Sequence, residues 1–224
     1  MQRILKIVLL IYEVISINNY CNAIELNGYI INSAQDTVYG KIKLNRFSPT
    51  TGALYLNGFD LESLSYRIEF KNDSDKSYQT FLPNTILEYG FEYNSCMYIY
   101  RSFLLKYNSI SAKERTKYKF LRLIYHGSLD LYKNINHLNI PTNIITVNNL
   151  ATYYEYFLVG TSAKTLKVER SNQIRTVRDL LRQFNVYEEY VQEIPENTKF
   201  KDIKTVLEIY DRWLSIHHPN TVKL

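Results

Sequence analysis

The stretch that decides the fold class is Phe120-Leu121-Arg122-Leu123-Ile124-Tyr125-His126-Gly127-Ser128-Leu129-Asp130-Leu131-Tyr132. We interpret Tyr125-His126-Gly127 as a three-residue hairpin loop. Gly127 takes the left-handed conformation, which would strain a residue with a Cβ. Antiparallel partners then step outward from the loop one pair at a time. The predicted pairs are Ile124 with Ser128, Leu123 with Leu129, Arg122 with Asp130, Leu121 with Leu131, and Phe120 with Tyr132.

This register sorts the side chains of the two strands by chemistry. One face carries four leucines, and the other carries an opposite-charge pair and an aromatic pair. A two-residue loop would place Leu123 opposite Asp130 and mix charge into both faces, so the longer loop is favoured. Because an isolated hairpin is marginal in water, we expect further strands or a helix to cover the leucine face.

Other segments alternate with the period of a half-buried strand. Residues 28–44 predict a hairpin whose turn is Ser33 to Asp36, because Val38, Gly40, Ile42 and Leu44 alternate with polar neighbours. Residues 134–149 are Asn-rich and predicted to be irregular. The further strands expected are Leu64–Phe70, Tyr78–Leu82, an aromatic stretch over Phe91–Leu105, and the pair Tyr153–Val159 and Thr165–Val168, joined through Gly160.

The period changes to that of a helix after residue 170. Val177, Leu180, Leu181 and Phe184 share one helical face, and a longer apolar face runs from Phe200 to Leu214 with Thr198 as its expected N-cap. A short segment, Val186–Ile194, lies between them. The predicted fold class is therefore α+β, an antiparallel β-rich body of hairpins followed by two or three C-terminal helices. The expected organisation is a signal peptide over residues 1–23, a β-rich domain over 24–170, and a helical segment over 171–224 packed on it.

Composition places the chain in the globular class. Its 224 residues are 46% hydrophobic and 22% charged, which excludes the disordered class. Tyrosine is the outlier, with 21 residues. Its ring suits half-buried strands and can stack on sugars or peptides, so the enrichment supports sheet structure more than any ligand.

Residues 1–23 predict an export signal. Arg3 and Lys6 supply the positive start, an apolar run follows, and small residues precede position 24. Glu13 lies inside the apolar run and favours the alternative, an ordinary N-terminal strand or helix. The apolar run is too short for a membrane span, so none is expected in the mature chain. Cleavage after Ala23 would leave Cys96 as the only cysteine, which we expect to be a buried small hydrophobe.

A series of short motifs covers nearly all of the mature chain: Gly28-Tyr29-Ile30, Asp36-Thr37-Val38, Gly40-Lys41-Ile42, Tyr78 to Ile86 with Gly90-Phe91, Phe120-Leu121 through Gly127 to Leu131-Tyr132-Lys133, Leu180-Leu181, Phe200-Lys201-Asp202-Ile203 and Ile209-Tyr210. The order of these motifs resembles a family of uncharacterised secreted proteins of Bacteroidetes-type bacteria. The family's turn glycine falls on Gln35, where this chain departs from the pattern. The resemblance implies a secreted protein, but the family has no assigned reaction or ligand from which a site could be transferred.

Positive charge concentrates between residues 101 and 133. Such a stripe is the footprint expected for an anionic partner, although one this short is more often a solvated face, and nucleic acid is the less favoured partner. Only Glu114 and Asp130 oppose the basic residues of the stretch, which are Arg101, Lys106, Lys113, Arg115, Lys117, Lys119, Arg122 and Lys133.

The sequence contains no recognisable catalytic constellation. His217 and His218 are neighbours and point apart on a helix, so they do not form a chelating pair, and His126 and His137 stand alone. Glu189 and Glu193, next to Glu188, share a helical face, a spacing common on solvated helices. There is no phosphate-binding glycine loop, nucleophile elbow, or zinc or calcium signature. We therefore assign no catalytic, cofactor-binding or metal residue.

Three function classes follow. The favoured one is an exported, non-enzymatic protein that is secreted, periplasmic or at the cell surface, and that binds a protein or an envelope polymer. The alternative is a polymer-degrading hydrolase whose acidic residues gather only in the fold. The third is anion or nucleic-acid binding through residues 101–133.

Overall fold

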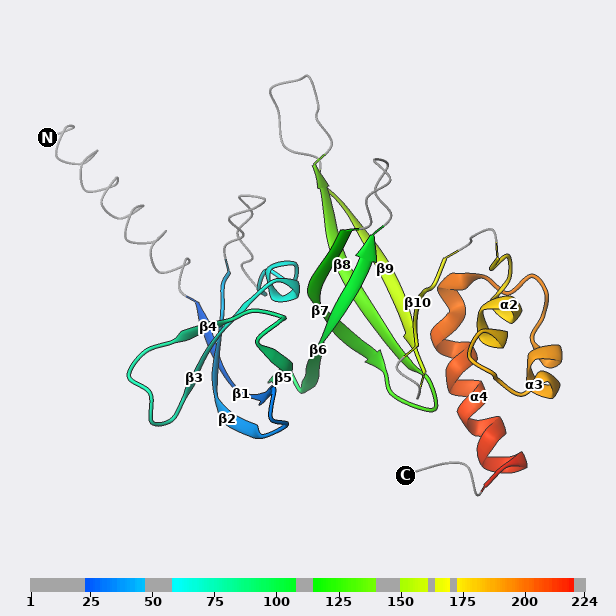
Figure 1. Ribbon diagram of the computed structural model, residues 1–224, viewed down its shortest axis with the longest axis horizontal. Helices are drawn as coiled ribbons and strands as arrows, with labels where there is room; N and C mark the ends of the chain where they lie inside the picture. The colour runs from blue at the N-terminus through cyan, green and yellow to red at the C-terminus, as the bar shows by residue number, and fades with distance from the viewer. Residues whose placement is uncertain are drawn as a thin grey trace, which may run out of the picture. The chain divides into compact units, whose positions relative to one another are not determined.

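The computed structural model describes residues 23–46, 58–107, 115–139, 150–160, 164–169 and 173–219. Within these ranges ten strands form one antiparallel sheet, in the order β10-β9-β8-β7-β6-β5-β1-β2-β3-β4 (Figure 1). Helices follow the last strand, which confirms the predicted α+β class. The chain divides into two compact units. Unit 1 contains Met1–Phe120 and His137–Thr152, and unit 2 contains Leu121–Asn136 and Tyr153–Leu224.

In unit 1 the predicted hairpin over residues 28–44 is confirmed. It pairs Gly28 with Gly40 and Ile30 with Val38, and it places Ile42 and Leu44 in the core. Gln35, where the resembling family has glycine, is left-handed at φ 69°. The strands assigned to this part of the chain are β1 (Ile24–Asn32), β2 (Thr37–Leu44), β3 (Ile68–Asn72), β4 (Gln79–Phe81), β5 (Ile86–Tyr93), β6 (Cys96–Tyr107) and the start of β7 (Arg115–Tyr125).

The core of unit 1 is an aromatic ladder across β5 and β6. Tyr89 faces Tyr100 and Phe91 faces Tyr98, with ring centroids 4.8 and 5.2 Å apart and nearly parallel planes. Burial raises the pKa of Tyr89, whose hydroxyl donates to the Leu64 carbonyl oxygen at 2.7 Å. Tyrosine enrichment is thus used for cross-strand packing.

Two predictions in unit 1 are wrong. Leu64 and Ser65 belong to a 3₁₀ turn, η1 (Ser63–Ser65), and the strand begins only at Ile68. Cys96 is exposed, because the aromatic stretch is broken by a two-residue turn in which Asn94 and Ser95 both have positive φ. This is the conformation of a tight type I′ hairpin, which brings Cys96 to the end of β6.

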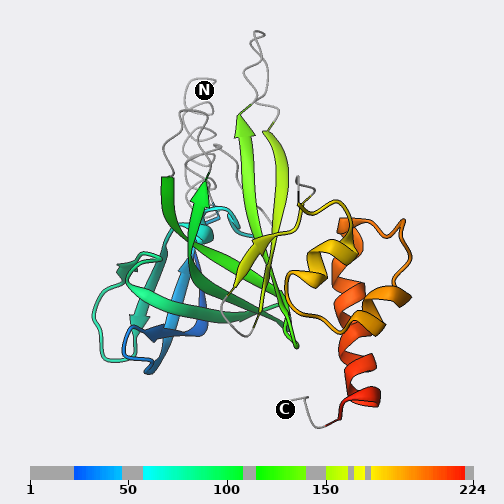
Figure 2. The ribbon, with the colours of Figure 1, turned by 45° about the vertical axis from the view of Figure 1, so that its right-hand side comes forward.

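In unit 2 the last strand pair is confirmed, with Thr165 opposite Val159. β8 extends to Asn139, so the irregular segment predicted from residue 134 is wrong over its first part. Helices and strands share one core, in which Leu131 and Leu158 pack with Leu180 and Leu207. The elements are β8 (Asp130–Asn139), β9 (Leu150–Val159), β10 (Thr165–Lys167), α2 (Val177–Arg182), α3 (Glu188–Glu193), η2 (Phe200–Asp202) and α4 (Ile203–His217). In both views α2 and α3 lie beside α4 (Figures 1 and 2).

The register predicted for the β7–β8 hairpin is wrong. Leu123 faces Tyr132 and Arg122 faces Lys133, with a bulge between Leu123 and Tyr125. In the observed register Lys133, and not Asp130, lies opposite Arg122, and the Asp130 carboxylate meets His126 Nδ1 in the loop at 2.6 Å.

Gly127 also differs from its prediction, because its φ lies outside the left-handed region. A Cβ at this position would instead overlap the Asp211 carboxylate. Contact with α4 therefore explains the need for glycine at this position.

Helix starts were predicted in part. Thr198 is not the N-cap of the last helix: η2 intervenes, and Asp202 precedes α4. The N-cap of α2 is Thr176, which forms a capping box with Asp179.

Several predictions fall outside the described residues. They are the export signal up to residue 22, residues 140–149 of the Asn-rich segment, and the side chains of Lys106, Lys113, Arg115 and His137. Over the part of the chain that is described, no helix is long and apolar enough to cross a membrane.

Candidate functional site

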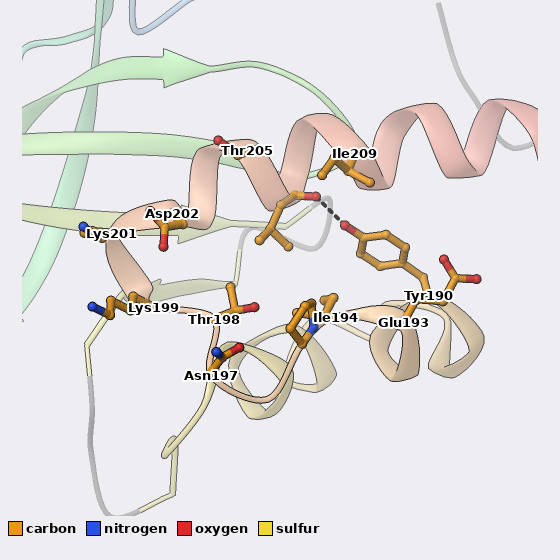
Figure 3. Close-up of a pocket in the computed structure, with 12 residues that line it drawn as sticks. Tyr190, Glu193, Ile194, Asn197, Thr198, Lys199, Lys201, Asp202, Thr205 and Ile209 are labelled. Carbon is orange, nitrogen blue, oxygen red and sulfur yellow. Dashed lines mark hydrogen bonds between the residues drawn. The ribbon is translucent and has the colours of Figure 1, made fainter.

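The candidate site is a groove of about 560 Å³ in unit 2, between α3, the segment that follows it, and α4 (Figure 3). We call it the α3–α4 groove. Its lining residues come from α3 and the loop to η2, then from η2 and the first half of α4. They are Tyr190, Glu193, Ile194, Pro195, Asn197, Thr198, Lys199, Lys201, Asp202, Thr205, Val206 and Ile209.

The floor of the groove is apolar. Ile194 and Val206 are buried, whereas Ile209 is 45% exposed. Tyr190 fixes α3 to α4, because its buried hydroxyl donates to the Val206 carbonyl oxygen at 2.6 Å (Figure 3). The floor is therefore a preformed apolar surface with one side chain open to solvent.

One wall of the groove is held in place by Arg178 of α2. Its Nε donates to the Ile194 carbonyl oxygen at 2.7 Å, and its Nη2 donates to that of Gln192 at 3.1 Å. Its Nη1 lies 3.3 Å from a carboxylate oxygen of Glu196. A planar guanidinium can satisfy these acceptors together, so the carbonyls at the C-terminal end of α3 have a side-chain partner.

The two ends of the groove differ in charge. Lys199 and Lys201 lie with Asp202 at one end, and Glu193 lies at the other (Figure 3). Within the described residues, neither lysine forms an ion pair. One end thus carries a net positive charge and the other a negative one, with the apolar floor between them.

The aromatic cluster behind the groove keeps its hydroxyl groups protonated. Burial, and then the Glu193 carboxylate, raise the pKa of Tyr190 to about 12. The Trp213 indole donates to Glu193 at 3.3 Å, and its ring centroid lies 5.8 Å from that of Tyr190. Tyr190 is therefore a hydrogen-bond donor at neutral pH and cannot serve as a base.

This arrangement suits binding better than acid–base catalysis. The carboxylates of Glu193 and Asp202 lie at opposite ends of the groove (Figure 3), and an acid–base pair would have to converge on one bond. Nor does any histidine of the described part of the chain line the groove. Among the residues described, no three His, Cys, Asp or Glu side chains gather to hold a metal ion.

The histidines singled out in the sequence lie apart from the groove lining. His217 Nδ1 approaches the Trp213 carbonyl oxygen at 2.9 Å, and His218 stacks on Tyr187 with centroids 4.0 Å apart. His126 is in the β7–β8 loop. The acidic set of α3 is also divided, because Glu188 pairs with Arg182 at 2.6 Å, away from Glu193.

The basic stretch does not form one continuous free stripe over its described side chains. Arg101 pairs with Glu88 at 2.9 Å, and Lys119 is buried with its Nζ 4.9 Å from the Tyr66 ring centroid. Lys133 lies 3.5 Å from the Tyr154 ring centroid. Burial, and then the facing Arg122, lower the pKa of Lys133.

Sequence reasoning singled out Glu193 as an acidic candidate and Thr198 as an N-cap, but it missed the basic end of the groove and the exposed residue of its floor. Lys199 and Lys201 flank the start of a 3₁₀ turn that no pattern indicated, and Ile209 does not belong to the buried face of α4. The signal that could have indicated the groove was Ile209 itself. It is an apolar residue of α4 that lies outside the buried apolar face formed by Val206, Tyr210 and Trp213.

Comparison with known proteins gives no relative: the chain matches no family model, no curated protein and no solved structure. The resemblance to secreted Bacteroidetes-type proteins stays a prediction.

Proposed function

We propose that the protein is an exported, non-enzymatic binding module that holds a segment of a partner protein in the α3–α4 groove. The observation that carries the proposal is the apolar floor, open to solvent at Ile209, between ends of opposite charge. A ligand that covers Ile209 removes apolar surface from water, and the charged ends select its orientation.

The charges define the order of side chains in the ligand. An acidic group fits the end formed by Lys199 and Lys201, an apolar side chain fits over Ile209, and a basic group fits beside Glu193. An extended peptide can present these three groups within a few residues.

The affinity should be modest. Covering an apolar side chain contributes about 1.5–3 kcal/mol, and each exposed ion pair adds roughly 0.2–1 kcal/mol. These terms sum to about 2–5 kcal/mol and association itself costs several kcal/mol, so we expect a short peptide to bind with a dissociation constant of about 1 mM or weaker. An affinity of this size suits a reversible contact.

Export rests on the composition of residues 1–23. The hydrolase alternative has less support, because the two carboxylates of the groove do not converge. Nucleic-acid binding has less support because Arg101 is paired and Lys119 is buried.

The binding test uses synthetic peptides of the order acid–apolar–base and the same peptides in reverse order. Trp213, the only tryptophan of the chain, bonds to Glu193 and reports occupancy by its fluorescence. We expect the forward order to bind at least about fivefold more tightly than the reverse, as two exposed ion pairs allow. Equal affinity for the two orders, or no binding at roughly 20 mM peptide, would overturn the proposal.

A matched pair of variants locates the contact. Ile209→Asp places a charge on the floor and should weaken forward-peptide binding about tenfold or more. Ile216→Asp makes the same change on the same helix at a residue that is 73% exposed and does not line the groove, and it should bind as the wild type does. Equal loss in both variants would contradict a site in the groove.

Export is tested separately by N-terminal sequencing of the protein from its native cell, fractionated into cytoplasm, periplasm and medium. A chain that begins at Ile24 outside the cytoplasm supports export. A chain that retains Met1 in the cytoplasm overturns that half of the proposal and leaves the groove test intact.

A further inference from the structure

A second hollow, of about 450 Å³, lies in unit 1 on the exposed face of β1, β2 and β5. Tyr29 on β1 faces Tyr39 on one side and Gly90 on the other, so these three positions form one row across the sheet. Asn27 and Glu92 follow on the same face, because side chains two residues apart on a strand share a face. The row therefore places two phenol rings beside a position without a side chain.

Gly90 is required by the ring of Tyr29. A Cβ at Gly90 would lie 2.6 Å from Cε1 and 2.8 Å from Cζ of that ring. The Tyr29 hydroxyl donates to Glu88 Oε1 at 2.8 Å, and Arg101 holds the other oxygen of Glu88 at 2.9 Å. Tyr29 is thus fixed at both its ring and its hydroxyl.

Tyr39 supplies the second ring. It is 70% exposed, and its centroid lies 6.3 Å from that of Tyr29 with the planes inclined by 58°. Two inclined rings at this separation leave space from which a cation can reach both within the roughly 6 Å at which a ring attracts it. An exposed tyrosine against a fixed one forms two walls of such a space.

The rim of the hollow is acidic. Asp73 and Glu92 line it, whereas no lysine or arginine among the residues that the structure describes does so. Over the described residues, neither carboxylate has a hydrogen bond or an ion pair, and Arg101 is already paired with Glu88. The negative charge of Asp73 and Glu92 on the rim therefore attracts cations and repels anions.

We propose that this hollow binds an organic ammonium group between Tyr29 and Tyr39, with Asp73 and Glu92 as its counter-charges. The rings alone would also suit the apolar face of a neutral sugar. The two unpaired carboxylates favour a cationic ligand over a neutral sugar, because they attract only a ligand that carries positive charge. The ammonium group can belong to an amino sugar or to a lysine side chain. This inference does not depend on the α3–α4 groove.

The test compares charged ligands with neutral ones of the same shape, by calorimetry and ligand-observed NMR on the whole chain. The first pair is choline and 3,3-dimethylbutan-1-ol, in which carbon replaces the ammonium nitrogen. We expect choline to bind at least about fivefold more tightly. Equal binding of the pair, or no binding of choline at 20 mM, a concentration chosen for roughly millimolar affinity, would overturn the proposal.

Two further pairs identify the source of the group. They are glucosamine with glucose, and Nα-acetyl-lysine amide with Nα-acetyl-norleucine amide. We expect the charged member of each pair to bind more tightly than the neutral one. Whichever of glucosamine and Nα-acetyl-lysine amide binds more tightly then identifies the source of the ammonium group as an amino sugar or a lysine side chain. Tighter binding of glucose than of glucosamine would instead assign a neutral saccharide and overturn the ammonium site.

Variants place the site on the sheet. Tyr39→Leu keeps an apolar side chain and removes the ring, and should weaken choline binding at least about threefold. Tyr118→Leu, at another exposed strand tyrosine that does not line the hollow, should have no effect. The double variant Asp73→Asn/Glu92→Gln should reduce the ratio of the affinity for choline to the affinity for its neutral analogue. An unchanged preference there would contradict the assigned counter-charges.

Discussion

The Tyr125 hydroxyl, at the end of β7, donates a hydrogen bond to the Asp211 carboxylate of α4. The same carboxylate accepts a hydrogen bond from the Ser128 backbone N–H, 3.2 Å away. Burial, followed by the bond to Asp211, raises the pKa of Tyr125 well above its ordinary value, so the phenol remains a donor at neutral pH. One side chain of α4 therefore fixes the β7–β8 loop at two points.

A double-mutant cycle should show this coupling. Asp211→Asn and Tyr125→Phe each weaken the contact, and we expect each to lower the free energy of unfolding by about 1–3 kcal/mol. Together they should cost less than the sum, with a coupling energy of about 1–2 kcal/mol from urea unfolding. Strict additivity would show that the two groups do not interact in solution.

Gly127→Ala should destabilise the protein through the same carboxylate. A Cβ at Gly127 overlaps Asp211, so the loop or α4 has to shift, at a cost of about 1–3 kcal/mol. Gly58→Ala is the matched control, because a Cβ there meets nothing within 4 Å. The cost of Gly127→Ala should shrink in an Asp211→Ser background. An equal cost in both backgrounds would mean that Asp211 is not what excludes the Cβ.

The elements that sequence predicted well are those fixed by local patterns. Alternation identified the β1–β2 hairpin, in which Ile42 and Leu44 are buried, and helical spacing identified the apolar face formed by Val206, Tyr210 and Leu214. Both patterns arise because one side of an element is buried, whatever covers it.

What sequence missed depends on distant partners. The β7–β8 loop is held by Asp211, which lies far along the chain from Tyr125, and no turn rule contains that contact. Cys96 was expected in the core because its neighbours are apolar, but the positive φ angles of Asn94 and Ser95 make it part of a hairpin end. The α3–α4 groove was missed because Lys199 and Ile209 meet only through packing.

The capping box of α2 should make stability depend on acid pH. Burial alone would raise the pKa of Asp179, but hydrogen bonds from Thr176 and from the backbone N–H of Arg175 outweigh it and lower the pKa below 3.8. Because the unfolded state then binds the proton more tightly, this contribution is present above pH 3.8 and is lost as pH falls through the folded pKa.

The variant Asp179→Asn isolates this effect. Its urea midpoint should lie below that of the wild type by a constant amount from about pH 7 to pH 5, and the difference should shrink below about pH 4. Glu189→Gln, in the first turn of α3, serves as the control and should show no such convergence. A wild-type advantage that persists unchanged at pH 2 would contradict the lowered pKa of Asp179.

Arg178 should support both stability and the α3–α4 groove. Arg178→Lys keeps the charge but cannot reach the carbonyl oxygens of Ile194 and Gln192 together, so we expect a loss of about 1–3 kcal/mol in urea unfolding followed by Trp213 fluorescence. Amide exchange should also rise in residues 192–198, and forward-peptide binding should weaken severalfold.

Arg212→Lys is the matched control for this prediction. Arg212 is exposed on α4 and donates only within its own helix, to the Glu208 carbonyl oxygen at 3.2 Å. Its replacement should change stability by less than about 0.5 kcal/mol and leave the groove intact. Equal stability of the two variants would show that the hydrogen bonds from the Arg178 guanidinium are not required to hold the C-terminal end of α3. If only Arg178→Lys lost stability but still bound the peptide normally, Arg178 would secure the fold without shaping the groove.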